Sequence, residues 1–160
     1  MTKSDSKLAF YFFFTALIVF IDQITKHYAE KNLIYGEAVQ ILPGIKMALL
    51  YNPGAAFGIL SDESGWQVGF LAGVSMLAAV GLVLWIWLHR EESFYSLLPL
   101  VLVLAGAIGN GIDRVRFGFV VDFISLYYDS WHWPTFNVAD SMISLGVFLL
   151  ILNSFSSRPD

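Results

Sequence analysis

"WQVGFLAGVSMLAAVGLVLWIWL", residues 66–88, is a run of 23 residues without a charged side chain. An α-helix needs about 17–25 mostly apolar residues to cross the hydrocarbon core of a bilayer. Tryptophan stands at both ends of the run, and its side chain is enriched at membrane–water interfaces. The run therefore predicts a membrane-spanning helix.

The composition of the whole chain agrees with a bilayer environment. Hydrophobic residues make up 57% of the 160 residues and charged residues only 14%, against roughly 25% charged in typical soluble domains. A soluble fold would have too little polar surface to cover such a core, so we predict a single membrane domain over residues 1–160. A net charge of −4 without a Lys/Arg run gives no sign of a nucleic-acid partner. The absence of cysteine excludes disulfides and thiol nucleophiles.

Three further stretches are candidate spans, at approximately 8–26, 94–112 and 137–153. The first follows a basic head but lacks a small-residue cleavage site, so it is predicted to be a retained span. The first and last stretches reach spanning length only by including Asp22 and Asp140. A charge at mid-helix costs about 2.5–3.5 kcal/mol and less near an interface, so both aspartates are predicted just inside the membrane boundary. The fold class is an α-helical integral membrane protein with four transmembrane helices.

Four spans alternate sides, so the polar residues at certain span ends must share one face of the membrane. The end of the first span, the loop before the second, the end of the third and the start of the fourth lie together. This face collects Asp22, Lys26, Asn52, Asn110, Asp113, Arg114, Asp122, Asn137 and Asp140. The opposite face keeps the two tails and the short "HREESF" turn, residues 89–94. Almost all candidate chemistry is therefore predicted on one side.

The orientation of that face is only weakly encoded. Four Lys or Arg residues fall on the face of the termini and five on the other, which does not decide between orientations by the positive-inside rule. The basic head before the first span favours both termini in the cytoplasm, and the polar face is then extracytoplasmic. Its two connections, residues 33–65 and 115–135, are punctuated by Pro and Gly or rich in β-branched and aromatic residues. They predict a small strand-containing region on the extracytoplasmic surface.

Asp122 and Asp140 are the strongest candidates for chemistry. They lie 18 residues apart, in "VVDF" and "NVAD", one on a strand-like surface segment and one at the start of a helix. Two carboxylates close together in a low dielectric share a proton, so one can activate water while the other acts as an acid. The alternative for Asp140 is a structural first-turn or capping acid that complements the helix dipole.

The other polar motifs each admit a structural and a functional interpretation. In "GNGIDR" (109–114), Asn110 and Asp113 share a helical face, and Arg114 could bind a phosphate or carboxylate or simply extend to the interface. In "DQITK" (22–26), the spacing of Asp22 and Lys26 predicts an intrahelical ion pair, more structural than catalytic. In "YNPGAAFG" (51–58), Asn52 precedes a Pro-Gly turn whose Gly54 could let a substrate backbone approach closely, unless it is a plain turn. Small residues four apart, Gly69/Gly73 and Ala105/Gly109, predict helix-packing surfaces.

Other chemistries find no support in the sequence. The three histidines lie on different segments without an HExxH pattern, and neither a GxSxG elbow nor a GxxxxGK[ST] loop is present. Two rival functions remain to be weighed. A proton-coupled transporter needs ionisable groups through the depth of the bundle, yet the middles of the second and third spans carry none. A structural partner of other membrane proteins would leave the clustered polar residues unexplained.

Taken in order, "DQITK", "NPGAAFG", "GAIGNGIDR", "VVDF" and "FNVAD" resemble the motifs of the lipoprotein signal peptidases, the type II signal peptidases of bacteria. The resemblance covers nearly the whole chain. It implies a multi-pass aspartyl protease of the plasma membrane, without metal or cofactor. The implied substrates are prolipoproteins whose lipobox cysteine carries diacylglycerol, and membrane lipids are the other partners. It implies catalytic roles for Asp122 and Asp140, and supporting roles for Asp22, Lys26, Asn52, Gly54, Asn110, Asp113, Arg114 and Asn137.

The resemblance also implies finer roles. Asn52 and Arg114 would hold backbone carbonyls of the substrate, and Asn110 and Asn137 would orient the two carboxylates. One departure from the family pattern is Ala105-Gly106, where paired glycines are common. The added methyl group is expected to tighten helix packing without touching the chemistry.

Overall fold

The computed structural model describes residues 3–54 and 65–156. Residues 55–58 of the "NPGAAFG" motif therefore lie outside the described residues. The helices and strands follow in the order α1 (Lys3–Asn32), β1 (Ala38–Leu42), β2 (Ile45–Asn52), α2 (Trp66–Leu88), α3 (Phe94–Phe117), β3 (Val120–Tyr128), β4 (Trp131–His132) and α4 (Val138–Ser156).

All four helices are long and apolar enough to cross a membrane. The predicted fold class, four transmembrane helices with a small strand-containing region, is confirmed. Helix α2 has the bounds expected for its span, whereas α1 and α3 continue to Asn32 and Phe117, beyond the span ends expected at 26 and 112. Charged residues end an apolar run without ending a helix, because Lys, Arg and Glu are themselves good helix formers.

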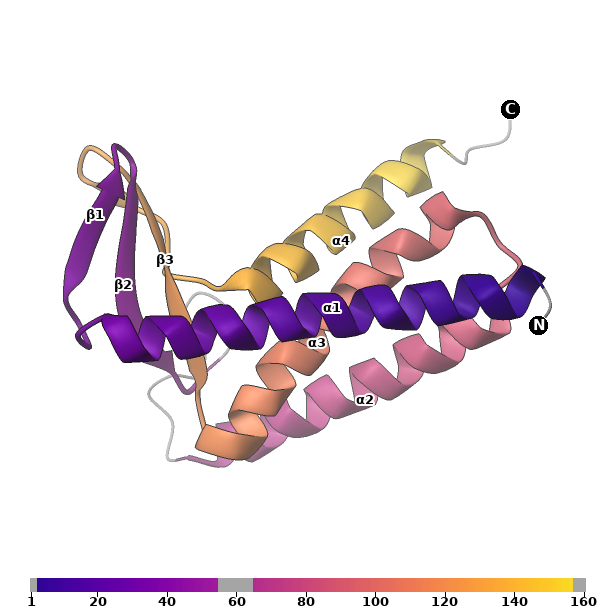
Figure 1. Ribbon diagram of the computed structural model, residues 1–160, viewed down its shortest axis with the longest axis horizontal. Helices are drawn as coiled ribbons and strands as arrows, with labels where there is room; N and C mark the ends of the chain where they lie inside the picture. The colour runs from indigo at the N-terminus through magenta and orange to yellow at the C-terminus, as the bar shows by residue number, and fades with distance from the viewer. Residues whose placement is uncertain (1–2, 55–64, 157–160) are drawn as a thin grey trace.

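Helix α3 is the central helix of the bundle and packs against α1, α2 and α4 (Figure 1). Half of its most apolar 18-residue stretch is buried in protein, against 6% of that of α2, so α2 presents most of its surface to lipid. Ser93 caps the start of α3 by accepting a hydrogen bond from the Ser96 amide. Gly118 ends it with a φ of +79°, a left-handed conformation that glycine adopts without strain.

Close packing of α3 on its neighbours depends on glycine at specific positions. A Cβ atom on Gly109 would lie 2.7 Å from a carboxylate oxygen of Asp22 on α1, and one on Gly106 would overlap the Ala139 carbonyl oxygen of α4. Ala105 is also buried, so the predicted packing role of this stripe is confirmed. Within residues 3–54 and 65–156, the same prediction for Gly69 and Gly73 of α2 is wrong: no atom of these residues lies within 4 Å of a Cβ built at either glycine. Spacing alone does not reveal which face of a helix is covered.

Gly106→Ala should destabilise the protein by about 2 kcal/mol, because the new methyl group meets backbone and the branched side chain of Ile143, whose Cγ1 lies 2.5 Å away. Thermal unfolding in detergent would measure the loss. Gly69→Ala is the matched control, since its methyl group faces open space and alanine is the better helix former. Equal stability of the two variants would contradict the close approach of α3 and α4.

The sheet lies at one end of the bundle, where α1 ends and α4 begins, and the other ends of these two helices lie at the opposite end (Figure 1). Its strands are antiparallel in the order β1-β2-β3-β4, with Leu50 opposite Asp122. Ala29 of α1, Leu49, Val121 and Phe123 form a buried apolar cluster that attaches the sheet to the bundle. The expectation that surface segments share one face with the polar span ends thus holds in the fold.

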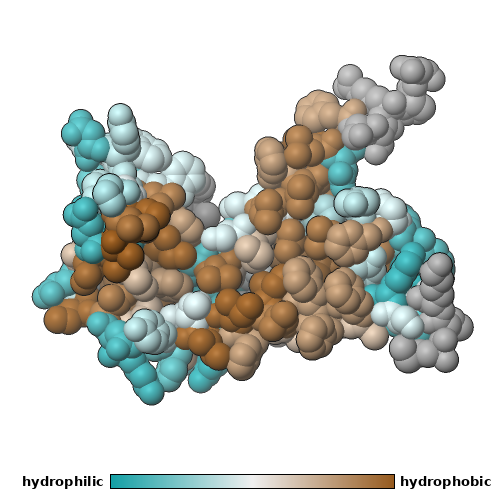
Figure 2. All heavy atoms as spheres, turned by 45° about the horizontal axis from the view of Figure 1, so that its top comes forward, coloured by the Kyte–Doolittle hydropathy of each residue, from teal (hydrophilic) through white to brown (hydrophobic). Residues whose placement is uncertain are grey.

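Hydrophobic side chains cover the middle of the molecule, and hydrophilic ones gather towards its two ends (Figure 2). Large apolar side chains such as Phe13 on α1, Leu77 on α2 and Phe148 on α4 are more than half exposed. Contiguous apolar surface on all of these helices is what a bilayer stabilises and water does not.

Candidate active site

Asp122 and Asp140 reach the same cavity from different elements. Asp122 lies on β3 and is 3% exposed, whereas Asp140 lies in the first turn of α4. Both line a cavity of about 280 Å³, which we call the aspartate cavity. Asn110 and Arg114 of α3 line it as well. The two carboxyl groups, distant in sequence, are therefore brought together as the motifs predicted.

Asn137 contacts both aspartates. Its side-chain Nδ2 donates to Asp122 Oδ1 at 2.7 Å. Its backbone N–H donates to Asp140 Oδ2 at 3.3 Å, and its Oδ1 accepts from the Asp140 backbone N–H at 2.9 Å. This reciprocal pair caps the start of α4. Asp140 is thus a first-turn capping acid and also a member of the cavity, so the two interpretations of this residue are compatible.

The remaining carboxylate oxygens are held by two more amides. Asn52 Nδ2 donates to Asp122 Oδ2 at 3.1 Å, and Asn110 Nδ2 donates to Asp140 Oδ1 at 2.7 Å. Each of the four carboxylate oxygens therefore accepts a hydrogen bond from an amide. This arrangement fixes the orientation of both groups relative to the cavity.

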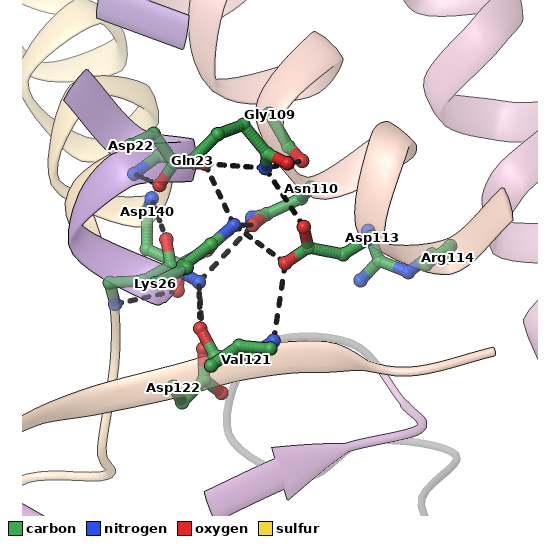
Figure 3. Close-up of polar contacts among 12 residues, drawn as sticks. Asp22, Gln23, Lys26, Gly109, Asn110, Asp113, Arg114, Val121, Asp122 and Asp140 are labelled. Carbon is green, nitrogen blue, oxygen red and sulfur yellow. Dashed lines mark hydrogen bonds and ion pairs between the residues drawn. The ribbon is translucent and has the colours of Figure 1, made fainter. Parts of the chain in front are cut away.

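A buried ionic cluster lies behind Asn110 (Figure 3). Lys26 Nζ is 2.9 Å from Asp22 Oδ2, 2.8 Å from Asp113 Oδ2 and 2.9 Å from Asn110 Oδ1. The predicted ion pair between Asp22 and Lys26 is therefore present, and Asp113 joins it. Because Lys26 occupies the Asn110 oxygen, the Asn110 nitrogen is directed at Asp140. The ammonium group thus determines which end of the Asn110 amide, oxygen or nitrogen, faces Asp140.

The two acids of the cluster also bind the backbone of neighbouring elements. Asp22 Oδ1 accepts from the Ala139 N–H of α4 at 2.9 Å, and Asp113 Oδ2 accepts from the Val121 N–H of β3 at 3.2 Å. Ala139 and Val121 are the residues adjacent to Asp140 and Asp122. The cluster therefore links α1 and α3 to the two segments that carry the aspartates.

Arg114 lies on the side of α3 that lines the aspartate cavity. Its Nη2 donates to the Gly54 carbonyl oxygen at 3.0 Å, while the Gly54 N–H donates to Asn52 Oδ1 at 3.0 Å. Arg114 Nε is buried and has no hydrogen-bond partner within the described part of the chain. The predicted turn after Asn52 thus connects Asn52, Gly54 and Arg114 beside Asp122.

The electrostatic environment of Asp122 favours its protonated form. Burial raises its pKa from an ordinary value of 3.8 to about 7, and the nearby charge of Asp140 acts in the same direction. Hydrogen bonds from Asn52 and Asn137 and the charge of Lys26 oppose the rise. A carboxyl group with a pKa near neutrality can exchange a proton with a reacting group at working pH.

The described residues, 3–54 and 65–156, hold no group of three or more His, Asp or Glu side chains arranged to bind a metal. Amide donors occupy the carboxylate oxygens that a metal would need. What the arrangement can do is transfer protons between two carboxyl groups and a water molecule.

The family model described as Signal peptidase (SPase) II matches residues 14–156. The chain belongs to the signal peptidase II family. The lipoprotein signal peptidase of Coxiella burnetii (strain RSA 493 / Nine Mile phase I) is 42% identical over 99% of this chain and 99% of its own length. That of Pseudoalteromonas atlantica (strain T6c / ATCC BAA-1087) is 45% identical over 92% and 90%. The resemblance seen in the motifs is confirmed.

Two solved structures of bacterial membrane enzymes share the fold. The one at 2.3 Å resolution superposes with a TM-score of 0.82 at 28% identity, over 95% of this chain and 93% of that one. The one at 1.9 Å resolution gives a TM-score of 0.80 at 29% identity, over 94% and 95%. The chain is therefore an aspartic peptidase of the signal peptidase II family, which removes signal peptides from prolipoproteins, and a multi-pass bacterial membrane protein.

Several residues at the site of this signal peptidase II family member are not among those that the motifs predicted. Gln23 Nε2 donates to Asp113 Oδ1 at 2.8 Å and to the Gly109 carbonyl at 3.2 Å, which ties α1 to α3. Its place inside "DQITK" was the available signal. Ser141 and Ser144 line the aspartate cavity from α4, and the signal for Ser144 was its position four residues after Asp140, on the same helical face. Trp133 and Thr135 line it from the segment just before Phe136, which pairs with Ile124 of β3, and no motif marks this pairing.

Proposed function

We propose that the substrate is a prolipoprotein whose lipobox cysteine carries diacylglycerol, and that this peptidase cleaves on the N-terminal side of that cysteine. Asp122 and Asp140 are the catalytic residues. The observation that carries the proposal is the shared cavity, in which amides hold both carboxyl groups and Asn137 contacts each of them. A membrane-embedded site suits a substrate that is itself anchored in lipid.

The pair works with one proton between its two carboxyl groups. The carboxylate accepts a proton from water while the water oxygen forms a bond to the scissile carbonyl carbon, and the protonated carboxyl gives its proton to the carbonyl oxygen. In the second step a hydroxyl group of the resulting diol gives its proton to the carboxylate of the pair. The protonated carboxyl group gives its proton to the cysteine nitrogen, and the C–N bond breaks. The products are a signal peptide with a new carboxyl terminus and a lipoprotein with a free amino group.

The supporting residues divide into three roles. Asn52, Asn110 and Asn137 orient the carboxyl groups. Arg114 is positioned to donate Nε to a substrate carbonyl, since this N–H has no partner among the described residues and the side chain lines the cavity. Because Asn52 donates to Asp122, we assign it to the carboxyl group and not to a substrate carbonyl. Lys26, Asp22 and Asp113 hold the elements that carry the pair.

The orientation that fits this function has both termini in the cytoplasm and the aspartates near the extracytoplasmic surface of the inner membrane. Asp122 lies on β3 and Asp140 in the first turn of α4, both at the sheet end of the molecule, and the start of α1 lies at the other end (Figure 1). Substrate would enter sideways from lipid, so that its signal helix stays in the bilayer while the cleavage site reaches the sheet.

Cleavage of a purified precursor in detergent tests the substrate assignment. A diacylglyceryl-modified precursor should be cleaved before its cysteine without added metal or nucleotide, and the same precursor without the lipid should be cleaved far more slowly. Mass spectrometry of the products would locate the cut. Equal rates on both precursors would contradict recognition of the lipid. If neither precursor were cleaved, the proposed function would be wrong.

The turnover number should fall as the pH is raised above about 7, because Asp122 then loses the proton that the pair shares. The sign follows from a pKa that lies above its ordinary value: protonation persists up to neutral pH and is lost beyond it. Asn52→Ala removes a hydrogen bond that lowers this pKa. The turnover number of this variant should therefore begin to fall at a higher pH than that of the unmodified enzyme. Rates measured from pH 5 to 9 would show this, and a fall that begins at lower pH would contradict it.

A further inference from the structure

Two cavities meet at Asp122. Besides the aspartate cavity, a second and more open cavity of about 600 Å³ borders the same carboxyl group. We call it the sheet cavity. Asn52, Asp122 and residues 133–135 line both cavities, whereas Leu50, Tyr51, Pro53, Ser125 and His132 line only the sheet cavity. The catalytic aspartate therefore lies at a junction with two exits.

The two cavities extend in different directions. The aspartate cavity reaches Ser141 and Ser144 of α4, a helix long and apolar enough to span the membrane. Of the residues that the structure describes, those lining the sheet cavity belong only to strands and to the connections that follow β2 and β4. A precursor also has two unlike sides, because its signal helix stays in lipid while the chain after the cysteine must reach water. A peptide lying across Asp122 would therefore leave along α4 on one side and over the sheet on the other.

Resting on the proposed function, we infer that the sheet cavity is the binding site for the residues that follow the lipidated cysteine, and that His132 is a specificity-determining residue for this mature part of the substrate. The lining offers hydrogen-bonding groups on Ser125, His132 and Thr135, together with the rings of Tyr51 and Trp133. An extended peptide of small or polar residues fits this chemistry. An apolar segment after the cysteine would be stabilised more by the bilayer than by this cavity.

His132 is oriented to form a hydrogen bond with such a peptide. Its Nδ1 lies 3.1 Å from the Ser130 carbonyl oxygen, which can only accept, so Nδ1 carries a hydrogen and Nε2 is the ring nitrogen left for the substrate. The ring also stacks on Tyr127 at 6.0 Å between centroids, which fixes its plane. The side chain is exposed on β4, so substrate can reach it.

Two lipidated precursors with the same signal peptide separate the cavities. One continues well beyond the cysteine, and the other ends as the amide of the residue after it. The unmodified enzyme should have a higher kcat/KM for the longer precursor. His132→Trp fills the sheet cavity and should lower kcat/KM about tenfold for the longer precursor. Its kcat/KM for the shorter precursor should equal that of the unmodified enzyme. His132→Ala should show a smaller loss, again confined to the longer precursor.

Tyr128→Trp is the matched control, since Tyr128 is 83% exposed in the same hairpin and lines neither cavity. The control variant should have the same kcat/KM as the unmodified enzyme for both precursors. Equal kcat/KM of the unmodified enzyme for the two precursors, or equal losses for both in His132→Trp, would overturn the inference. If the unmodified enzyme cleaved neither precursor, the proposed function would fall instead, so the two failures are distinguishable.

Discussion

Asp122→Asn and Asp140→Asn should each lower the turnover number by about 10⁴-fold, because each variant removes one of the two groups between which protons must pass. An amide cannot accept a proton from water, nor can it give one up to a carbonyl oxygen. Asparagine keeps the shape and an oxygen acceptor, so the contacts from Asn137 and Asn110 to these positions can persist. Single-turnover cleavage of a lipidated precursor in detergent would measure the loss.

Both variants should remain folded, which separates lost chemistry from lost structure. Asp129→Asn is the matched control: Asp129 is exposed in the turn after β3 with a φ of +53°, a conformation that asparagine tolerates well. It should keep full activity. Activity within about tenfold of the unmodified enzyme in either catalytic variant would show that the carboxyl group is dispensable.

The raised pKa of Asp122 also gives Asp122→Asn a pH-dependent effect on stability. A carboxyl group whose folded-state pKa is about 7 is disfavoured in its ionised form by the fold. This cost begins as the pH rises above the unfolded-state pKa and is complete above the folded-state pKa. The neutral amide does not incur it. The free energy of unfolding of Asp122→Asn minus that of the unmodified enzyme should therefore be larger at pH 8 than at pH 4.

The sequence was sufficient to predict that the polar span ends come together at one end of the helix bundle, but not which of their side chains contact one another. Alternation of four spans brings Asp22, Asn110 and Asp140 to the same side whatever the orientation. It does not say that Asn110 accepts from Lys26 and donates to Asp140, because this depends on the rotation of α3 about its axis. That rotation is set by contacts such as Gly106 against Ala139, which involve residues 33 positions apart.

The sheet was predictable as strand and turn but not in its register. Asp122 lies on the same face of the sheet as Asn52 and contacts its side chain, because β2 and β3 change register between Met47 and Leu50. A shift of one residue would turn Asp122 to the opposite face of the sheet. Turn residues such as Gly44 indicate where strands reverse, yet the irregularity lies inside β2, where no glycine or proline marks it. The short β4 and its His132 were likewise beyond the sequence pattern.

Asp22→Ala should destabilise the protein by about 3 kcal/mol, because it leaves the buried ammonium group of Lys26 with fewer counter-charges. Asp22 is fully buried and bonds both Lys26 Nζ and the Ala139 N–H. Its loss therefore weakens an ion pair and the attachment of α4 to α1 at once. Thermal unfolding in detergent and the yield of folded protein would measure the effect, whereas the turnover number of the folded fraction should be largely retained.

A double-mutant cycle distinguishes this account from two unrelated losses. Lys26→Met alone should also be destabilising, since it leaves Asp22 and Asp113 buried without their cation. In the double variant Asp22→Ala/Lys26→Met the cost should be smaller than the two single costs added, because both changes break the same contact. Strict additivity would show that the ion pair contributes nothing. A normally stable Asp22→Ala protein without turnover would instead move Asp22 from the scaffold into the chemistry, since its Oδ1 holds the residue directly before Asp140.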